Sequence, residues 1–138
     1  MLFAFDRDYT VDCAEDPGPV PLAWLKALKP SHLCWAIGNP KLGLEAGIAT
    51  HHTIKELCAN RGVHVEMPTV SVGHLHEKWH SNAEGKIRRM FRLSALYPDS
   101  CRVVVDDIDL STMPGWLWVS PRGFVAPGLD FWLRLEAA

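Results

Sequence analysis

Short apolar runs that end abruptly in charged residues are the most regular feature of this sequence. The run Leu2–Phe5 passes directly into Asp6, and a continuous run of this kind predicts a strand that is buried on both faces of a sheet. The β-branched run 102–105 ends in the same way, at Asp106 and Asp107. Further strands are predicted at His32–Ile37, at Trp116–Ser120 and, from alternating apolar and polar residues, at Val63–Met67.

Apolar residues at helical spacing separate these strands. Pro21 is suited to begin a helix, Thr50 or Thr53 to cap one, and Gly62 and Pro98 to end two of them. The expected helices cover residues 22–28, 41–46, 50–60, 86–97 and 129–135. In the last of these, the residues expected to face inward are Phe131, Trp132 and Leu135.

The alternation of strands and helices predicts one α/β domain over residues 1–138, with a mostly parallel sheet and right-handed crossovers. In such sheets, ligands bind outside the carboxyl ends of the strands, which is where both acidic pairs are expected. The acidic and Pro-rich segment 12–21 reads as a loop, and Pro68–Glu84 reads as an irregular stretch.

Composition and charge narrow the class of protein. Apolar residues make up 48% of the 138 residues and charged residues 22%, as in a soluble globular domain. A net charge of −2 does not indicate nucleic-acid binding, although a local basic cluster is present at Lys86, Arg88, Arg89 and Arg92. We expect no signal peptide and no membrane partner, because no apolar stretch is long enough for either.

The four cysteines at 13, 34, 58 and 101 form no CxxC pair, so free thiols are expected. Cys34 and Cys101 adjoin apolar runs, where cysteine commonly behaves as a small buried hydrophobe. This usage favours a reducing, cytoplasmic location.

Two strands that deliver carboxylates to one sheet edge create a cluster of like charge, which a cation would stabilise. Mg²⁺ is the expected cofactor, since it prefers oxygen ligands and is usually bound by one or two carboxylates together with a substrate phosphate. The Asp6-x-Asp8 spacing also allows two roles, with Asp6 facing the metal and Asp8 reaching the leaving group of a substrate.

These motifs resemble those of the haloacid dehalogenase (HAD) superfamily. The stretch 6–11 (DRDYTV) is similar to the family's DxDx(T/V) signature, and Asp106-Asp107 after the strand 103–105 is similar to its fourth motif. The stretch 35–39 (WAIGN) stands where the second motif is expected, and Lys86 where the third is expected. The resemblance implies a small three-layer α/β/α HAD-like (Rossmannoid) fold with a minimal cap or none.

The resemblance also implies roles for individual residues in a Mg²⁺-dependent phosphomonoesterase. Asp6 would attack phosphorus to form an aspartyl phosphate, Asp8 would act as general acid and base, and Lys86 would pair with the nucleophile and the phosphate, with Arg89 as the alternative for that role. Asp106, with Asp107 as the competing choice, would hold the metal together with Asp6 and the backbone carbonyl of Asp8. The expected substrate-binding residues are Thr10, Gly38, Asn39 and Arg89.

Two departures from the family pattern affect these expectations. Gly38 or Asn39 stands where a serine or threonine hydroxyl normally binds the phosphoryl group; the backbone N–H of Gly38 and the Asn39 amide are the expected replacements. The absence of room for a large cap predicts an open site, and capless members of the family often act on bulky or macromolecular phosphates or borrow a lid from a second subunit. Two alternative functions remain: an inactive phosphate-binding or protein-interaction module, and a phosphatase that processes nucleic-acid ends.

Each candidate residue also has a purely structural interpretation. Asp6 and Asp8 suit a turn after a strand, and Lys86 suits a solvated helix face. The histidines His74, His76 and His80 have spacing compatible with zinc, but no cysteine or nearby acid other than Glu77 would complete the site, which favours a polar loop that touches substrate. Trp79 is the tryptophan that stacking on a nucleic acid would most readily use.

Overall fold

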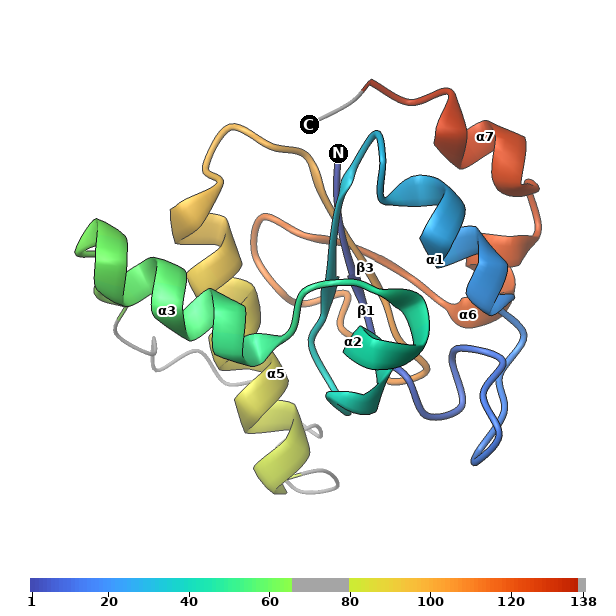
Figure 1. Cartoon of the computed structure of the whole chain (residues 1–138), viewed down its shortest axis with the longest axis horizontal. Helices are drawn as coiled ribbons and strands as arrows, with labels where there is room; N and C mark the ends of the chain where they lie inside the picture. The colour runs from blue at the N-terminus through green and yellow to red at the C-terminus, as the bar shows by residue number, and fades with distance from the viewer. Residues whose placement is uncertain (66–79, 137–138) are drawn as a thin grey trace.

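The computed structural model describes residues 1–65 and 80–136, which form a four-stranded sheet and six helices (Figure 1). The strands are β1 (Leu2–Phe5), β2 (Leu33–Ala36), β3 (Arg102–Val105) and β4 (Leu117–Val119). The helices are α1 (Leu22–Leu28), α2 (Lys41–Ala46), α3 (His51–Arg61), α5 (His80–Leu96), α6 (Pro121–Val125) and α7 (Leu129–Leu133).

The sheet is parallel throughout, in the order β2-β1-β3-β4. The strand β1 is central, and its last residue, Phe5, is in register with Ala36 of β2 and with Val105 of β3. All four residues of β1 are buried, as the uninterrupted apolar run predicts for a strand covered on both faces. The strands β1 and β3 therefore end side by side at the same sheet edge.

Alternate residues of the strands face two separate hydrophobic cores. On one face, Leu2 and Ala4 of β1 and Val104 of β3 pack with α3 and α5, which lie together on one side of the sheet (Figure 1). The α5 residues in this core recur every three residues, as in an amphipathic helix: Ile87, Met90, Leu93 and Leu96.

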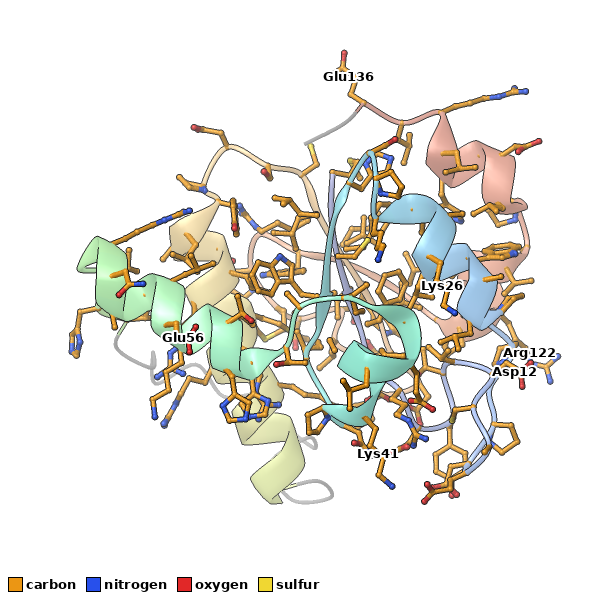
Figure 2. The ribbon with its side chains drawn as sticks, in the orientation of Figure 1. Asp12, Lys26, Lys41, Glu56, Arg122 and Glu136 are labelled. Atoms are coloured by element: carbon orange, nitrogen blue, oxygen red, sulfur yellow. The ribbon has the colours of Figure 1, made fainter. Side chains whose placement is uncertain are left out.

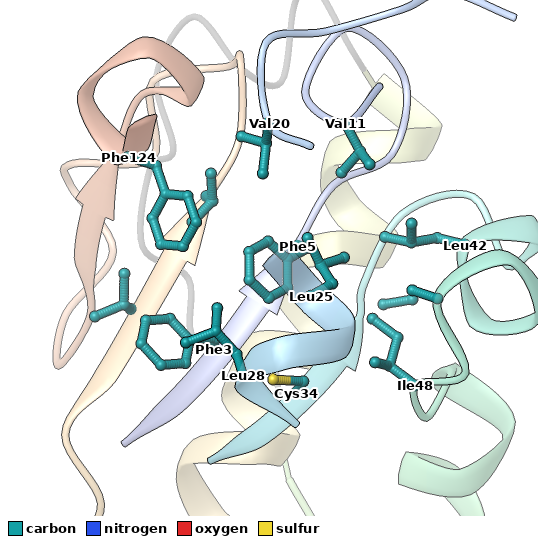
Figure 3. Close-up of a cluster of buried hydrophobic side chains, with 14 of the residues drawn as sticks. Phe3, Phe5, Val11, Val20, Leu25, Leu28, Cys34, Leu42, Ile48 and Phe124 are labelled. Atoms are coloured by element: carbon teal, nitrogen blue, oxygen red, sulfur yellow. The ribbon is translucent and has the colours of Figure 1, made fainter. Parts of the chain in front are cut away.

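The second core is rich in aromatic side chains, and α1, α2, α6 and α7 all contribute residues to it. Figure 3 shows Phe3, Phe5 and Phe124 grouped within this cluster. Phe3 and Phe5 of β1 meet Phe124 of α6 edge-on, with ring centroids 6.1 and 5.6 Å apart. Trp132 of α7 stacks on Phe124 at 4.6 Å and donates its indole N–H to the Phe124 carbonyl. Aromatic burial on this scale fixes the short C-terminal helices against the sheet.

Local sequence explains where several elements begin and end. Gly62 ends α3 in the left-handed conformation, with φ of 65°, which glycine adopts without a steric penalty. Ser120 begins α6, because its hydroxyl accepts a hydrogen bond from the N–H of Gly123 and Pro121 occupies the first helical position. The amino group of Met1 donates to the carbonyl of Glu136, whose side chain extends away from the ribbon (Figure 2).

The predicted α/β class and the parallel sheet are confirmed. The strands β1 to β4 and the helices α1, α2, α3, α5 and α7 also lie where the sequence predicted a strand or a helix. The strand expected at Val63–Met67 is wrong for the described residues 63–65, which follow α3 as irregular backbone. The helix expected from Lys86 begins at His80, so Pro68–Glu84 is helical at its end; the remainder of that stretch lies outside the described residues. The helix α6 was not predicted, although Ser120-Pro121 is a recognisable helix start.

Two side-chain predictions are corrected by the structure. Phe131 is 50% exposed, because the short helix α7 turns only Trp132 fully inward. Cys101 is also exposed, since it precedes β3 rather than lying within it, whereas Cys34 is buried as expected. All four cysteines are free. No helix among the described residues has the length and apolar character needed to cross a membrane.

His32 is a buried titratable residue at the end of the sheet opposite the acidic residues. Its ring meets Phe3 edge-on at 5.3 Å, and only 4% of the residue is exposed. Neither ring nitrogen makes a hydrogen bond of normal geometry within the described residues. Burial therefore lowers the pKa of His32 below its ordinary value of 6.5.

We expect His32 to make the protein less stable in acid. Because its pKa is lower in the folded than in the unfolded state, the unfolded chain binds the extra proton, and stability is lost as pH falls below 6.5. In His32→Phe, the free energy of unfolding measured by urea denaturation should fall less steeply over this range. The exposed His64, changed to Gln, is the control and should keep the parent's slope. An equal slope in His32→Phe would contradict the assignment.

Candidate functional site

Asp6 and Asp106 follow directly after the neighbouring strands β1 and β3. The N–H of Asp6 donates to the carbonyl of Val105 at 3.0 Å, which continues the ladder between the strands by one residue. The two aspartates are therefore neighbours at the carboxyl edge of the sheet. Both are buried, Asp6 with 5% and Asp106 with 0% of the residue exposed.

Lys86 of α5 lies between these two carboxylates. Its ammonium nitrogen is 3.0 Å from Oδ1 of Asp6 and 2.9 Å from Oδ2 of Asp106. Lys86 is itself buried, so this residue is no solvated helix face. Buried charges require partners, and one lysine shared by two aspartates leaves the group with an excess negative charge when all three are ionised.

The pKa values of the two buried carboxyl groups are both raised. Burial, followed by repulsion from Asp106, raises the pKa of Asp6 to about 8. Burial also raises the pKa of Asp106 to about 6, against the opposing attraction of Lys86. Burial alone would lower the pKa of Lys86, but the two carboxylates outweigh it and raise the pKa above its ordinary value. Ionisation of both aspartates is therefore unfavourable without a further cation.

A third carboxylate completes a candidate metal site. One oxygen each from Asp6, Asp106 and Asp107 can be chosen so that all lie within 4.8 Å of one another. Asp107 is exposed, whereas the other two are buried, so the group faces solvent on one side. An all-oxygen donor set with an open side and unfavourable mutual repulsion fits Mg²⁺, which keeps several of its waters. Both choices left open by the sequence, Asp106 and Asp107, belong to this set.

Asp8 lies at the rim of the same site and is held by Arg7. The guanidinium Nη1 of Arg7 is 2.8 Å from Oδ1 of Asp8, and Nε and Nη2 of Arg7 are 2.5 and 3.2 Å from the two carboxylate oxygens of Glu45. Arg7 is only 2% exposed, so α2 anchors the residue between the two acids. This bidentate pairing, which fixes where the Asp8 side chain lies, is a role for Arg7 that the sequence analysis did not assign.

Thr10 supports Asp6 from the loop that follows β1. Its hydroxyl donates to Oδ2 of Asp6 at 3.2 Å, and the threonine is completely buried. Thr10 therefore contacts the candidate nucleophile, whereas it is not among the residues that line the pocket beside Asp6. The expected role in binding substrate becomes, in this geometry, a role in orienting a carboxylate.

Gly38 lies against the carboxylate of Asp6. A Cβ atom placed on Gly38 would be 2.5 Å from Oδ1 of Asp6, closer than real contacts allow. A side-chain hydroxyl at this position is therefore sterically excluded as the site stands. The side-chain oxygen Oδ1 of the neighbouring Asn39 accepts a hydrogen bond from the backbone N–H of Lys41 at 3.0 Å. The side-chain NH₂ group of Asn39 is therefore the part that remains for a ligand.

A pocket of about 440 Å³ opens in front of these residues. Asp6, Asp8, Lys86 and Asp107 line it, and so does Arg89, whose guanidinium also donates to the carbonyl of Ile37. The other residues of its lining are Tyr9, Asp16, Gly38, Asn39, Pro40 and Ile108. The structure thus brings the predicted candidates together around one pocket, with Thr10 and Asp106 behind it.

Some candidate residues lie outside the described part of the chain, and some residues of the pocket were not among the candidates. His74, His76 and Trp79 lie outside the described residues, and the side chain of His80 does too. Tyr9 and Asp16 line the pocket but were not singled out, because their place depends on how the loop folds back. The position of Tyr9, immediately after Asp8, is the one signal that the sequence offered.

Comparisons of the chain with family models, with curated proteins and with solved structures found no match. The chemistry of the site therefore has to be inferred from its own residues and geometry.

We expect Gly38→Ala to disturb the site. The added methyl group must displace the Asp6 carboxylate, which Lys86 and Thr10 hold, and overpacking of this kind typically costs about 1–3 kcal/mol. Thermal unfolding and Mg²⁺ titration calorimetry should show lower stability and weaker binding. Gly85→Ala is the matched control, because its Cβ would meet only the flexible end of Arg89. Unchanged stability and metal affinity in Gly38→Ala would contradict this geometry.

The raised pKa of Asp6 predicts that the metal-free protein loses stability as pH rises. The protonated carboxyl is favoured in the folded state, so its contribution is present below 3.8, the unfolded value, and is lost as pH rises through about 8. The amide introduced by Asp6→Asn cannot ionise, so the free energy of unfolding of the variant should increase relative to that of the parent as pH rises across this range. Excess Mg²⁺ should raise the free energy of unfolding of the parent more at the alkaline end of the range than at the acidic end.

Urea denaturation with and without Mg²⁺ measures this difference. Asp12→Asn removes an exposed carboxylate from the same loop and should leave the pH dependence of the parent unchanged. A constant difference between Asp6→Asn and the parent over the whole pH range would show that Asp6 has an ordinary pKa.

Proposed function

We propose that this protein is a Mg²⁺-dependent phosphomonoesterase of the HAD-like type, with Asp6 as the nucleophile. The observation that carries the proposal is the contact of the Asp6 carboxylate with Lys86 and Thr10, beside two further aspartates and in front of a pocket. The order of the strands, with β1 central and β3 beside it, supports a three-layer HAD-like arrangement with the acids at the carboxyl edge.

In the first half of the reaction, a carboxylate oxygen of Asp6 attacks phosphorus. The bond between phosphorus and the leaving oxygen breaks, and Asp8 transfers a proton to that oxygen so that an alcohol leaves. Lys86 and Arg89 attract the phosphoryl oxygens from the pocket wall. The Gly38 N–H is a further donor to these oxygens, since glycine has no side chain of its own to keep a ligand from its backbone.

In the second half, Asp8 takes a proton from a water molecule, which attacks the phosphorus of the aspartyl phosphate. The bond to Asp6 breaks, and inorganic phosphate and the free carboxylate are regenerated. Arg7 keeps Asp8 in place for both proton transfers without itself lining the pocket. Asp6, Asp106 and Asp107 would hold a Mg²⁺ ion, which would supply positive charge to offset the negative charge of the phosphoryl oxygens.

The pocket lining bears on the alternative functions. Among the described residues, four aspartates and two cations line it, so a polyanionic nucleic acid meets repulsion around the site of chemistry. A small phosphomonoester with one anionic group is the better fit. The inactive module remains the second candidate, because Gly38 removes the side-chain hydroxyl that the family pattern provides.

We expect Asp6→Asn to lose at least about a thousandfold of the turnover of para-nitrophenyl phosphate in the presence of Mg²⁺, because the amide is a poor nucleophile. Circular dichroism should show that the variant remains folded. Asp12→Asn is the control and should retain the activity of the parent. Undiminished hydrolysis by Asp6→Asn would rule out Asp6 as the nucleophile.

The same assay separates the alternatives. A parent protein that binds Mg²⁺ but hydrolyses none of a broad set of phosphomonoesters would be a phosphate-binding module. Faster hydrolysis of a 5′-phosphorylated oligonucleotide than of the free nucleotide would favour processing of nucleic-acid ends.

A further inference from the structure

The pocket extends beyond the residues that the phosphate chemistry needs. Its volume of about 440 Å³ lies in the range of small-molecule sites, roughly 300–1,000 Å³. Lys86, Arg89 and the aspartates of the sheet edge account for the phosphoryl group and the metal. Tyr9, Asp16, Pro40 and Ile108 line the same pocket and have no part in that chemistry.

Tyr9 and Asp16 have an unusual backbone conformation. They are the non-glycine residues with positive φ among the described residues, at 62° and 46°. The left-handed conformation is unfavourable for a residue with a bulky side chain, and such residues cluster at ligand sites, where the surrounding structure enforces them. Both lie on the loop between β1 and α1, and both line the pocket.

The loop holds these two residues against each other. The N–H of Tyr9 donates to the carbonyl of Asp16 at 2.7 Å, and a side-chain hydrogen bond to Asp16 raises the pKa of the Tyr9 hydroxyl. Gly18 permits the close return of the chain, because a Cβ there would be 2.4 Å from the backbone of Thr10. The pair is thus a preformed wall of the pocket, beside Asp8.

This wall combines two kinds of surface. Tyr9 is 56% exposed and belongs to neither hydrophobic core, so its ring is available to a ligand. Asp16 offers carboxylate oxygens that accept hydrogen bonds. An aromatic face suits the C–H face of a ring, and a carboxylate suits sugar hydroxyl groups, as in ribose recognition by acidic residues. The surrounding aspartates repel a second anionic group on the ligand.

We infer that Tyr9 and Asp16 recognise the sugar ring of a phosphorylated sugar whose phosphate lies at Asp6, so that these two residues determine specificity for an uncharged, hydroxyl-bearing leaving group. This inference rests on the proposed phosphomonoesterase function. A free sugar phosphate and a nucleoside 5′-monophosphate share this chemistry.

Steady-state kinetics with Mg²⁺ on ribose 5-phosphate, AMP and n-propyl phosphate test the inference, since all three are esters of primary alcohols. We expect the parent to prefer ribose 5-phosphate or AMP over n-propyl phosphate by about tenfold or more in kcat/KM. Tyr9→Gly should lose most of this preference through a higher KM, with kcat largely kept. Glycine suits a φ of 62°, so circular dichroism and thermal unfolding should show an intact fold.

Two further variants separate the ring from the charge. Asp16→Asn should also reduce the preference, because it removes the carboxylate while asparagine tolerates the left-handed conformation. Asp12→Asn makes the same charge change at the outer edge of the loop, away from the pocket, and should keep the preference of the parent (Figure 2). Faster turnover of AMP than of ribose 5-phosphate would identify the nucleotide as the source of the sugar, and the reverse would identify the free sugar phosphate.

The outcomes distinguish the two proposals. If the parent hydrolyses neither para-nitrophenyl phosphate nor any of the three esters, the phosphomonoesterase function and this inference both fail. If it hydrolyses para-nitrophenyl phosphate but none of the three esters, the inference alone fails. If the parent hydrolyses all three at similar rates, or if Tyr9→Gly slows them all equally, the phosphatase stands and the specificity role of Tyr9 and Asp16 is wrong.

Discussion

The ammonium group of Lys86 lies between two buried carboxylates, and the arrangement of the site depends on this contact. Asp6 and Asp106 come from adjacent parallel strands in register, so the sheet itself forces two like charges together. Burial raises the pKa of each aspartate, repulsion from Asp106 adds to it for Asp6, and the one lysine does not outweigh these effects. A site of this kind is suited to a divalent cation and an anionic substrate.

The surroundings of Asp6 are fixed by contacts from four parts of the chain. Lys86 approaches from α5, Thr10 from the loop after β1, Asp106 from the end of β3 and Gly38 from the turn after β2. The glycine is a steric requirement of this packing, because any Cβ would collide with the carboxylate. A serine or threonine at position 38 would therefore have to displace the Asp6 carboxylate.

The loop after β1 supplies the side of the pocket that faces away from the sheet. Arg7 is anchored to Glu45 of α2 and holds Asp8, while Tyr9 and Asp16 adopt strained backbone conformations beside it. Strain of this kind persists only where the surrounding structure determines the conformation. In the proposed phosphatase, the sheet edge therefore carries the phosphoryl chemistry, and the loop contributes proton transfer and the recognition of the leaving group.

The sequence by itself determined the elements with a strong periodic signal and the residues at their ends. Buried strands read as unbroken apolar runs, so β1 and β3, and the aspartates that follow them, were predictable. Lys86 and Gly38 were candidates only through the resemblance, and Tyr9 was not a candidate. The contacts of all three depend on which strands pair and how a loop returns, which are contacts between distant residues or backbone angles that no local pattern encodes. The short helix α6 shows the same limit, since its five residues are stabilised by packing against Phe3 and Phe5 rather than by helical periodicity.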